Sequence, residues 1–144
     1  MEIRRAKPDD ATRIAELEEL YFSDPWQKMD IFSYVCSEDG MCFTALENDK
    51  PIAYLIGRII APEGEIYRIA VDENYRRRGV GFRLLSFALK TERGRGLEAT
   101  FLEVRKKNLP ARKLYLAYGF REIGERKNYY KNPTDDAVIM LLGK

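Results

Sequence analysis

Hydrophobic and polar residues alternate along the chain with two different periods. Apolar residues at helical spacing predict four helices, over about residues 11–21, 27–37, 79–93 and 110–118. Apolar and β-branched runs predict seven strands, over about 2–7, 42–47, 52–60, 66–71, 99–105, 120–130 and 137–142, with turns at 48–51 and 61–64. The order βααβββαβαββ is that of an α+β domain with a mixed sheet, in which a crossover makes the strands at 66–71 and 99–105 parallel.

The stretch over residues 66–85 combines a strand, a basic turn with glycines and the start of a helix. Gly79 and Gly81 would lie in the first helical turn, where glycine lets a ligand approach the backbone and adopts dihedrals that other residues avoid. The first N–H groups of a helix lack partners and carry the positive end of its dipole, so an anion suits this place. Positive charge is added just before it by Arg76, Arg77 and Arg78. The alternative is an ordinary strand-to-helix turn with solvated arginines.

The spacing Arg76-x-x-Gly79-x-Gly81 is neither the Rossmann nor the Walker A pattern. It resembles the cofactor loop of the GNAT superfamily of acetyl-CoA-dependent N-acyltransferases, and residues 100–119 match the second half of that core. The segments IAVDENYRRRGVG, LEVRKKN, LYLAYGF and RKNYY are similar to one branch, the RimI-type ribosomal-protein alanine N-acetyltransferases. The resemblance covers essentially the whole chain. It implies the GNAT fold, a mixed sheet with helices on both faces whose strands at 65–72 and 99–105 splay apart around the acetyl-CoA thioester.

Length and composition limit the class of protein. With 144 residues, of which 45% are hydrophobic, the chain predicts one domain over 1–144. Histidine is absent and the two cysteines, Cys36 and Cys42, lack CxxC spacing, so we expect no metal site and expect both cysteines to be small core residues. The N-terminus has no signal-peptide pattern, and no apolar run approaches the roughly 20 residues that span a bilayer. These features predict a reduced, cytoplasmic setting.

Two side chains are candidates for acid–base chemistry. Glu103 lies in the otherwise apolar run Phe101–Val104, where a carboxylate is costly without partners or a function. It is either the partner of Arg105 or of a neighbouring strand, or a general base, and the resemblance assigns it as the base. Tyr115 would by itself be explained as a core residue of the helix at 110–118. The resemblance makes it the general acid that protonates the departing thiolate, a role that a phenol can fill.

The resemblance also implies a set of cofactor contacts. The exposed backbone of one splayed strand would bind the pantetheine arm like an added strand, with the N–H of Ala70 or Val71 facing the thioester carbonyl. Asn108 is most simply a cap or turn residue, but the resemblance places its amide on the pantetheine arm. Arg76 and Arg78 would contact the 3′-phosphate or remain solvated. The expected cofactor-binding residues are Ile69, Ala70, Val71, Arg76, Arg77, Arg78, Gly79, Val80, Gly81, Phe82, Asn108 and Tyr115.

Three aromatic residues are candidates for holding the acceptor, since aromatics give rigid contact area at low entropic cost. These are Trp26, for which core packing is the alternative, and Tyr129 and Tyr130, which precede a polar loop. The sequence thus predicts an acetyl-CoA-dependent enzyme acting on a protein N-terminus, with a ribosomal protein beginning with alanine as the implied partner. A GNAT enzyme for a small amine or a lysine is one alternative. An RNA-binding module is another, because basic clusters and aromatics are frequent, although the net charge of +2 does not require it.

Overall fold

The computed structural model describes residues 1–143, so the last position of the domain expected over 1–144 lies outside the described residues. One seven-stranded sheet in the order β1-β2-β3-β4-β5-β7-β6 forms the centre of the molecule. The strands are β1 (Glu2–Arg5), β2 (Gly40–Glu47), β3 (Lys50–Ile60), β4 (Glu63–Val71), β5 (Ala99–Arg105), β6 (Arg121–Tyr130) and β7 (Asp135–Gly143). The helices are α1 (Ala11–Tyr21), α2 (Lys28–Cys36), α3 (Val80–Arg93) and α4 (Leu109–Tyr118), with short 3-10 turns at Pro8–Asp10 and Glu73–Tyr75. The predicted α+β element order is confirmed.

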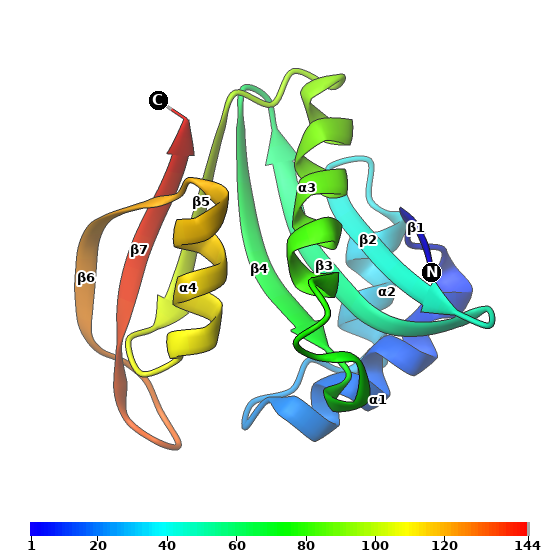
Figure 1. The fold of residues 1–144 in the computed structure, drawn as a ribbon, viewed down its shortest axis with the longest axis horizontal. Coiled ribbons are helices and arrows are strands. Elements are labelled where there is room, and N and C mark those ends of the chain that lie inside the picture. Colours follow the sequence, from blue (N-terminus) through cyan, green and yellow to red (C-terminus); the bar gives the residue numbers. More distant parts are fainter. Residues whose placement is uncertain (144) are drawn as a thin grey trace.

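The sheet is mixed, as predicted. Strands β1 to β4 form one antiparallel group, of which β2 to β4 are a meander, and β5, β7 and β6 form a second antiparallel group. Strands β4 and β5 run parallel where the two groups meet. The parallel pairing covers only four residue pairs, from Glu63↔Ala99 to Ile66↔Leu102. Beyond Ile66 and Leu102 the two strands separate, and Figure 1 shows the gap widening toward the end of β4. The splay implied by the resemblance is therefore present.

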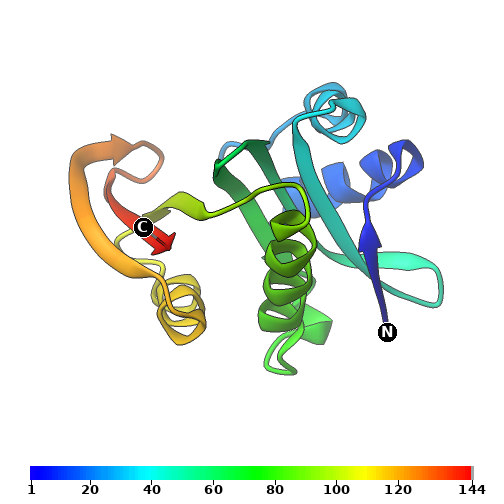
Figure 2. The ribbon, with the colours of Figure 1, turned by 90° about the horizontal axis from the view of Figure 1, so that it is seen from above.

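Helices cover both faces of the sheet. Figures 1 and 2 show α3 and α4 on one face and α1 and α2 on the other. The larger core packs Leu84, Leu85 and Leu89 of α3 against the sheet residues Ile66 and Leu102. A second core packs Ile14, Leu17 and Ile31, from the two N-terminal helices, against Tyr54 and Ile56. Because the side chains of a strand alternate between faces, Glu65, Tyr67 and Glu103 point away from α3.

The structure moves several predicted boundaries. The hairpin between β2 and β3 turns on Asn48 and Asp49 alone, both at positive φ, so Lys50 and Pro51 already belong to a strand. A two-residue turn of this kind matches the twist of antiparallel strands and needs no further residues. Likewise the predicted turn at 61–64 is shorter, because Glu63 and Gly64 pair with β3 and β5.

The two cysteines have different environments. Cys42 is buried in β2 beneath α1 and α2, as predicted, and burial raises the pKa of its thiol to about 12. The prediction that Cys36 is a core residue was wrong, since this cysteine ends α2 on the exposed side of the helix. The buried face of α2 is carried by Ile31, and Cys36 lies five residues later, which is 140° further round the helix.

Candidate active site

The separation of β4 and β5 leaves part of the β4 backbone without a partner strand. The Asp72 N–H donates to the Ile52 carbonyl on β3, at 2.7 Å. Since backbone groups alternate in direction along an antiparallel pair, Ala70 also faces β3, while Ile69 and Val71 face the gap. Of the two amides expected to face a thioester carbonyl, Val71 therefore has the suitable direction and Ala70 has not. The Val71 carbonyl accepts a hydrogen bond from Arg76 Nε at 2.8 Å.

The glycine loop lies at the wide end of the gap. Gly79 is the N-cap of α3 at φ +74°, and an added Cβ there would meet nothing within 4 Å, so the space before the helix N-terminus is open. Gly81 lies in the first turn, where a Cβ would approach Leu114 of α4 at 3.3 Å and Val71 at 3.7 Å. The first glycine gives the loop its left-handed turn, and the second lets α3, α4 and β4 come together. The prediction that both lie at the helix start is confirmed.

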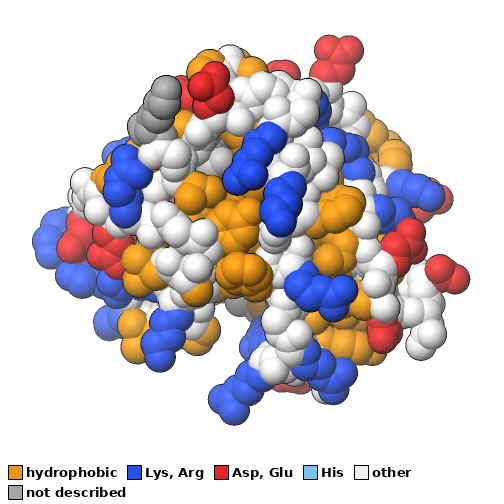
Figure 3. Space-filling view, turned by 45° about the horizontal axis from the view of Figure 1, so that its top comes forward, with side chains coloured by type: hydrophobic (Ala, Val, Ile, Leu, Met, Phe, Trp, Pro, Cys, Tyr) orange, Lys and Arg blue, Asp and Glu red, His pale blue; other side chains and the backbone are white. Residues whose placement is uncertain are grey.

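The three arginines of the loop differ in their contacts. Arg76 stacks over Tyr21, 4.4 Å from the ring centroid, and Arg78 lies over Tyr75 at 5.4 Å. Arg77 has a positive φ of 64°, so the loop turns at this residue as well as at Gly79. On the face shown in Figure 3, hydrophobic side chains gather in the middle, and Lys and Arg side chains stand on both sides of a notch at the lower edge. Two of the three loop arginines thus lie over aromatic rings, and the third takes part in the turn.

Glu103 follows the last paired residue of β5, where that strand leaves β4. Its side chain is 22% exposed, while the carboxylate oxygen Oε2 is buried and lies 3.1 Å from Arg126 Nε of β6. The carboxylate is thus ion-paired, but with neither of the partners considered in the sequence, because Arg126 belongs to β6 and β7 lies between β5 and β6. Arg105 instead donates to the carbonyls of Lys131 and Pro133 and holds the β6–β7 loop. The ion pair is open to solvent on the Arg126 side, because the Arg126 side chain is 56% exposed.

Tyr115 lies on the inner side of α4, where its ring packs edge-on against Phe120 with centroids 5.6 Å apart. Burial, and then the nearby Tyr130 phenol, raise the pKa of Tyr115 above its ordinary value. Tyr130 is itself influenced by Glu103, since burial and then that carboxylate raise the pKa of Tyr130 to about 12. Both phenols therefore remain protonated at neutral pH, and Tyr130 lies within electrostatic reach of both predicted catalytic groups.

Asn108 caps α4. Its side-chain oxygen accepts the Ala111 N–H at 3.2 Å, which confirms the cap interpretation of this residue. The capping bond uses the amide oxygen, and the amide nitrogen remains a donor. A cap at this position fixes the start of α4 and thereby the direction of Tyr115.

A cavity of about 460 Å³ opens on the sheet face away from α3 and α4, along the paired part of β4 and β5 and the first residues beyond it. It is lined by Glu65, Tyr67, Phe101, Glu103 and Arg126, among others. The pKa of Glu65 is raised by burial and then by the Glu103 charge, against the effect of Arg126. The predicted base therefore faces a space large enough for a small group or a peptide end, with a second carboxylate beside it.

The three aromatic candidates border this region to different degrees. Trp26 is half-buried, stacks on Tyr34 at 5.1 Å and packs against Tyr67 at 5.9 Å. It therefore packs against the second core and contacts a residue that lines the cavity. Tyr130 is half-buried at the end of β6 and lies edge-on to Tyr129, which is exposed. Core packing is thus part of the role of Trp26, and the tyrosine pair is accessible, as expected.

Sequence reasoning did not find several residues of the site. Glu65 directly follows the turn predicted at 61–64, although the structure places it in β4. Tyr67 is the extra residue of a β-bulge in β4, and Arg126 lies in a strand that carries charges of both signs. No local signal distinguishes them, because their proximity depends on strand register. Two further residues, Glu18 and Arg68, meet beneath residues 22–27, which join α1 to α2 and are called the α1–α2 segment below, although the two are fifty positions apart.

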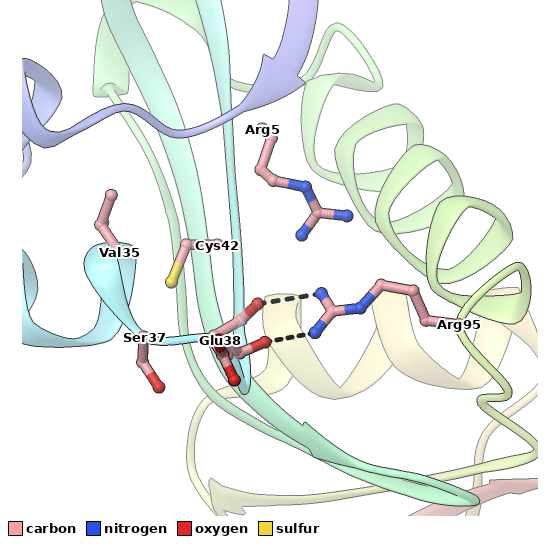
Figure 4. A pocket seen from close by; sticks show the side chains of 7 residues that line it. Arg5, Val35, Ser37, Glu38, Cys42 and Arg95 are labelled. Carbon is pink, nitrogen blue, oxygen red and sulfur yellow. Dashed lines mark hydrogen bonds between the residues drawn. The ribbon is translucent and has the colours of Figure 1, made fainter.

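A second cavity, of about 260 Å³, lies elsewhere in the molecule. Figure 4 shows Arg5 and Arg95 on one side of it, with Arg95 bonded to the backbone carbonyls of Glu38 and Gly40, and Cys42 on another side. It shares no lining residue with the cavity at Glu103. Within residues 1–143, no three His, Cys, Asp or Glu side chains gather as a metal site would require, and none of the helices is long and apolar enough to cross a membrane.

Several basic residues are occupied by contacts within the molecule. Arg112 donates to the Lys106 carbonyl and to Glu122, and Arg95 and Arg105 bind backbone carbonyls. Guanidinium groups held in this way are not free to follow a phosphate backbone. The RNA-binding alternative loses part of its basic surface for this reason.

Comparisons with known proteins agree with this geometry. The sequence profile described as "Acetyltransferase (GNAT) family" matches residues 11–120. The ribosomal protein bS18-alanine N-acetyltransferase of Haemophilus ducreyi is 33% identical over 139 residues, covering 92% of this chain and 93% of that protein. The N-alpha-acetyltransferase RimI of Mycobacterium tuberculosis is 35% identical over 137 residues, covering 91% and 85%. The crystal structure of the ribosomal-protein-S18-alanine N-acetyltransferase from Escherichia coli superposes with a TM-score of 0.90 at 31% identity, over 99% of this chain and 92% of that one. Together with the splayed strands and the glycine loop, these matches establish that the chain belongs to the GNAT family of acetyltransferases.

Proposed function

We propose that the protein is an acetyl-CoA-dependent N-acetyltransferase that acetylates the N-terminal α-amine of a protein, with a ribosomal protein beginning with alanine as its acceptor. The observation that carries the proposal is the separation of β4 and β5, which leaves β4 backbone without a partner strand, together with the cavity that Glu103 lines. The activities after which the relatives are named support this acceptor. A ribosomal acceptor would be met in the cytoplasm.

The chain's own groups suit an acetyl-CoA molecule lying across the gap. The Ile69 and Val71 backbone faces the gap and would pair with the amides of the pantetheine arm, as an added strand pairs with a sheet edge. The open space at Gly79 and the N–H groups at the start of α3 would receive the pyrophosphate. The Val71 N–H would stabilise negative charge that develops on the thioester oxygen.

Glu103 would remove the proton from the acceptor amine, directly or through a water. The amine arrives mostly as an ammonium ion, so it must lose a proton before it can attack the thioester. The Glu103 carboxylate is paired only with a half-exposed arginine, so it can exchange this partner for the positively charged amine of the acceptor. The general-base function thus needs Arg126 to move away, which its exposed side chain permits.

Tyr115 would return a proton to the departing thiolate. Burial keeps its phenol protonated, so the proton is present when the thiolate forms. A general acid must lie within hydrogen-bond reach of the leaving atom, and the inner face of α4 beside the gap is a suitable origin.

The preference for an α-amine follows from acid–base equilibria. An α-amine has a pKa near 8 against about 10.4 for lysine, so roughly a hundredfold more of it is neutral at pH 7. One partly exposed carboxylate is then sufficient. The Trp26 segment and the Tyr129–Tyr130 strand end would guide an extended N-terminus toward Glu103.

The test offers matched peptides that begin with alanine and contain one internal lysine, with the N-terminus either free or blocked. We expect acetylation at the α-amine of the free peptide, located by mass spectrometry, and no comparable reaction of the blocked one. A panel of polyamines and small amines at the same concentrations serves as the control. Lysine acetylation of the blocked peptide at an equal rate, or faster reaction of a small amine, would contradict the proposal.

A further inference from the structure

A fully buried carboxylate lies beneath the segment that joins α1 to α2. Glu18 has no exposed surface, and its carboxylate accepts hydrogen bonds from the Tyr54 phenol and from the Trp26 backbone N–H, the latter at 2.8 Å. Arg68 Nε lies 3.4 Å from the same carboxylate. Burying an unpaired carboxylate costs several kcal/mol, so these donors are required in the folded state. Glu18 therefore determines where the Trp26 backbone lies.

Arg68 connects the same segment to β4, the strand that borders the gap. Its Nη2 donates to the Asp24 carbonyl at 2.6 Å. Its guanidinium lies over the Phe22 ring at 4.2 Å and over the Trp26 ring at 5.0 Å. The α1–α2 segment is thus attached to β4 by one hydrogen bond and two cation–π contacts, in addition to the bond that Glu18 makes.

The attachment extends to the cavity wall through aromatic contacts. Trp26 packs against Tyr67 with ring centroids 5.9 Å apart, and Tyr67 lines the cavity that contains Glu103. Tyr67 is also the extra residue of the β4 bulge, so the regular pairing with β3 does not hold it. Only two side chains therefore separate the buried carboxylate from the space beside the predicted base.

We propose that Glu18 and Arg68 are positioning residues, which fix the α1–α2 segment as one wall of the acceptor entrance. This inference rests on the proposed function, because it assumes that the acceptor enters beside Trp26 and Tyr67. Neither charged group touches the acceptor. Loss of the pair lets the segment move away from β4, which weakens acceptor binding but leaves the acetyl-CoA side of the sheet unchanged.

The chain offers a matched control for a purely structural role. Glu92 is also fully buried and is paired with two arginines, Arg5 at 2.7 Å and Arg95 at 2.9 Å, where Glu18 is paired with one. These arginines line the separate cavity of Figure 4, away from Glu103. Substitution of either buried glutamate removes one buried charge. Of the two glutamates, only Glu18 contacts the α1–α2 segment.

The experiment compares Glu18→Gln with Glu92→Gln in steady-state kinetics with both substrates. For Glu18→Gln we expect the acceptor KM to rise about tenfold, equivalent to about 1.4 kcal/mol of binding free energy. Its KM for acetyl-CoA and its kcat should change less than twofold. Glu92→Gln should leave all three constants unchanged. Both variants should lower the melting temperature by similar amounts, because each loses one buried charge. An unchanged acceptor KM in Glu18→Gln, or an equal rise in both variants, would overturn the proposal.

A second measurement uses the single tryptophan of the chain, which is Trp26 itself. Acrylamide quenching of its fluorescence should increase in Glu18→Gln and remain at the wild-type level in Glu92→Gln. Arg68→Lys keeps the charge but loses the planar guanidinium and its stacking on the aromatic rings, so the same rise in acceptor KM and in quenching is expected. This variant tests the proposal even if Glu18→Gln does not fold. Unchanged quenching in a folded Glu18→Gln or Arg68→Lys protein would also refute the positioning role.

The kinetic test remains interpretable if the proposed acceptor is wrong. The acceptor KM is then measured with whichever amine of the panel the wild-type enzyme modifies fastest. In that case the proposed function fails, whereas the comparison of Glu18→Gln with Glu92→Gln still decides the positioning role.

Discussion

Glu103 and Tyr115 lie on opposite faces of the sheet, and each has one predicted task. Glu103→Gln and Tyr115→Phe should each reduce kcat on the order of 100-fold, the usual effect of losing an acid or a base. Neither change alters packing, so acetyl-CoA should still raise the melting temperature. Raising the pH should partly restore Glu103→Gln, because more of the amine is then neutral without a base. An unchanged rate at neutral pH would refute the base assignment.

Asp10 shows a different use of a carboxylate, in stability. Burial acts to raise the pKa of Asp10, but hydrogen bonds from Arg4 and from the Lys7 N–H, the latter at 2.7 Å, outweigh it and lower this pKa. A lowered pKa in the folded state gives stability that is present above the unfolded value near 3.9 and is lost as the pH falls through the folded value. Asp10→Asn should therefore lose about 1 to 2 kcal/mol in urea unfolding at pH 7. The difference from wild type should shrink below about pH 4. Asp9→Asn, at an exposed neighbouring position, is the control, and an Asp10 effect that persists at pH 2 would contradict this account.

At the scale of elements, β4 has one edge paired and one edge open near its end. The amide of Ala70 faces β3, whereas those of Ile69 and Val71 face the gap. Hydrogen exchange should therefore be slow at Ala70 in the free protein and fast at Ile69 and Val71. Adding acetyl-CoA should slow the exchange of Ile69 and Val71 and change Ala70 little. Equal protection of all three amides in the free protein would show that the gap is closed in solution.

The approach of α3 to α4 depends on Gly81, where a Cβ would lie 3.3 Å from Leu114. Gly81→Val should push the two helices apart and remove the acetyl-CoA-induced rise in melting temperature, while the chain still folds. Gly124→Val on β6 is the matched control, because a Cβ there meets only Ile139 at an ordinary 3.7 Å. A normal ligand shift in Gly81→Val would show that this contact does not shape the cofactor site.

At the scale of the whole molecule, two groups of strands meet over only four residue pairs and are otherwise joined through helices. A ligand that bridges the gap binds only when both groups are folded and correctly placed. At a concentration one hundred times its Kd, acetyl-CoA should stabilise the protein by about 2.7 kcal/mol, which raises the melting temperature by roughly 10 °C. ATP at the same concentration, which has phosphates but no pantetheine arm, should give a much smaller rise. No shift with several millimolar acetyl-CoA would refute the cofactor assignment.

The sequence by itself determined the features that depend on near neighbours in the chain. Helix and strand limits follow from the periodicity of apolar residues and from turn residues, so β5 was predicted at its observed bounds and α3 to within one residue. The glycine loop was also predictable, because its left-handed turn and its helix start lie within a few residues of each other. Family resemblance added the roles of Glu103 and Tyr115, which composition and spacing left open.

Only the tertiary structure decided which distant residues meet. The insertion of β7 between β5 and β6, the end of pairing at Ile66 and Leu102, and the ion pair of Glu103 with Arg126 all depend on strand order and register. The meeting of Glu18 with Arg68 depends in the same way on the packing of α1 against the sheet. Local periodicity fixes the face on which a side chain lies, but its partner there is fixed by the free energy of the whole packed chain, because a strand shifted by one residue would present its other face.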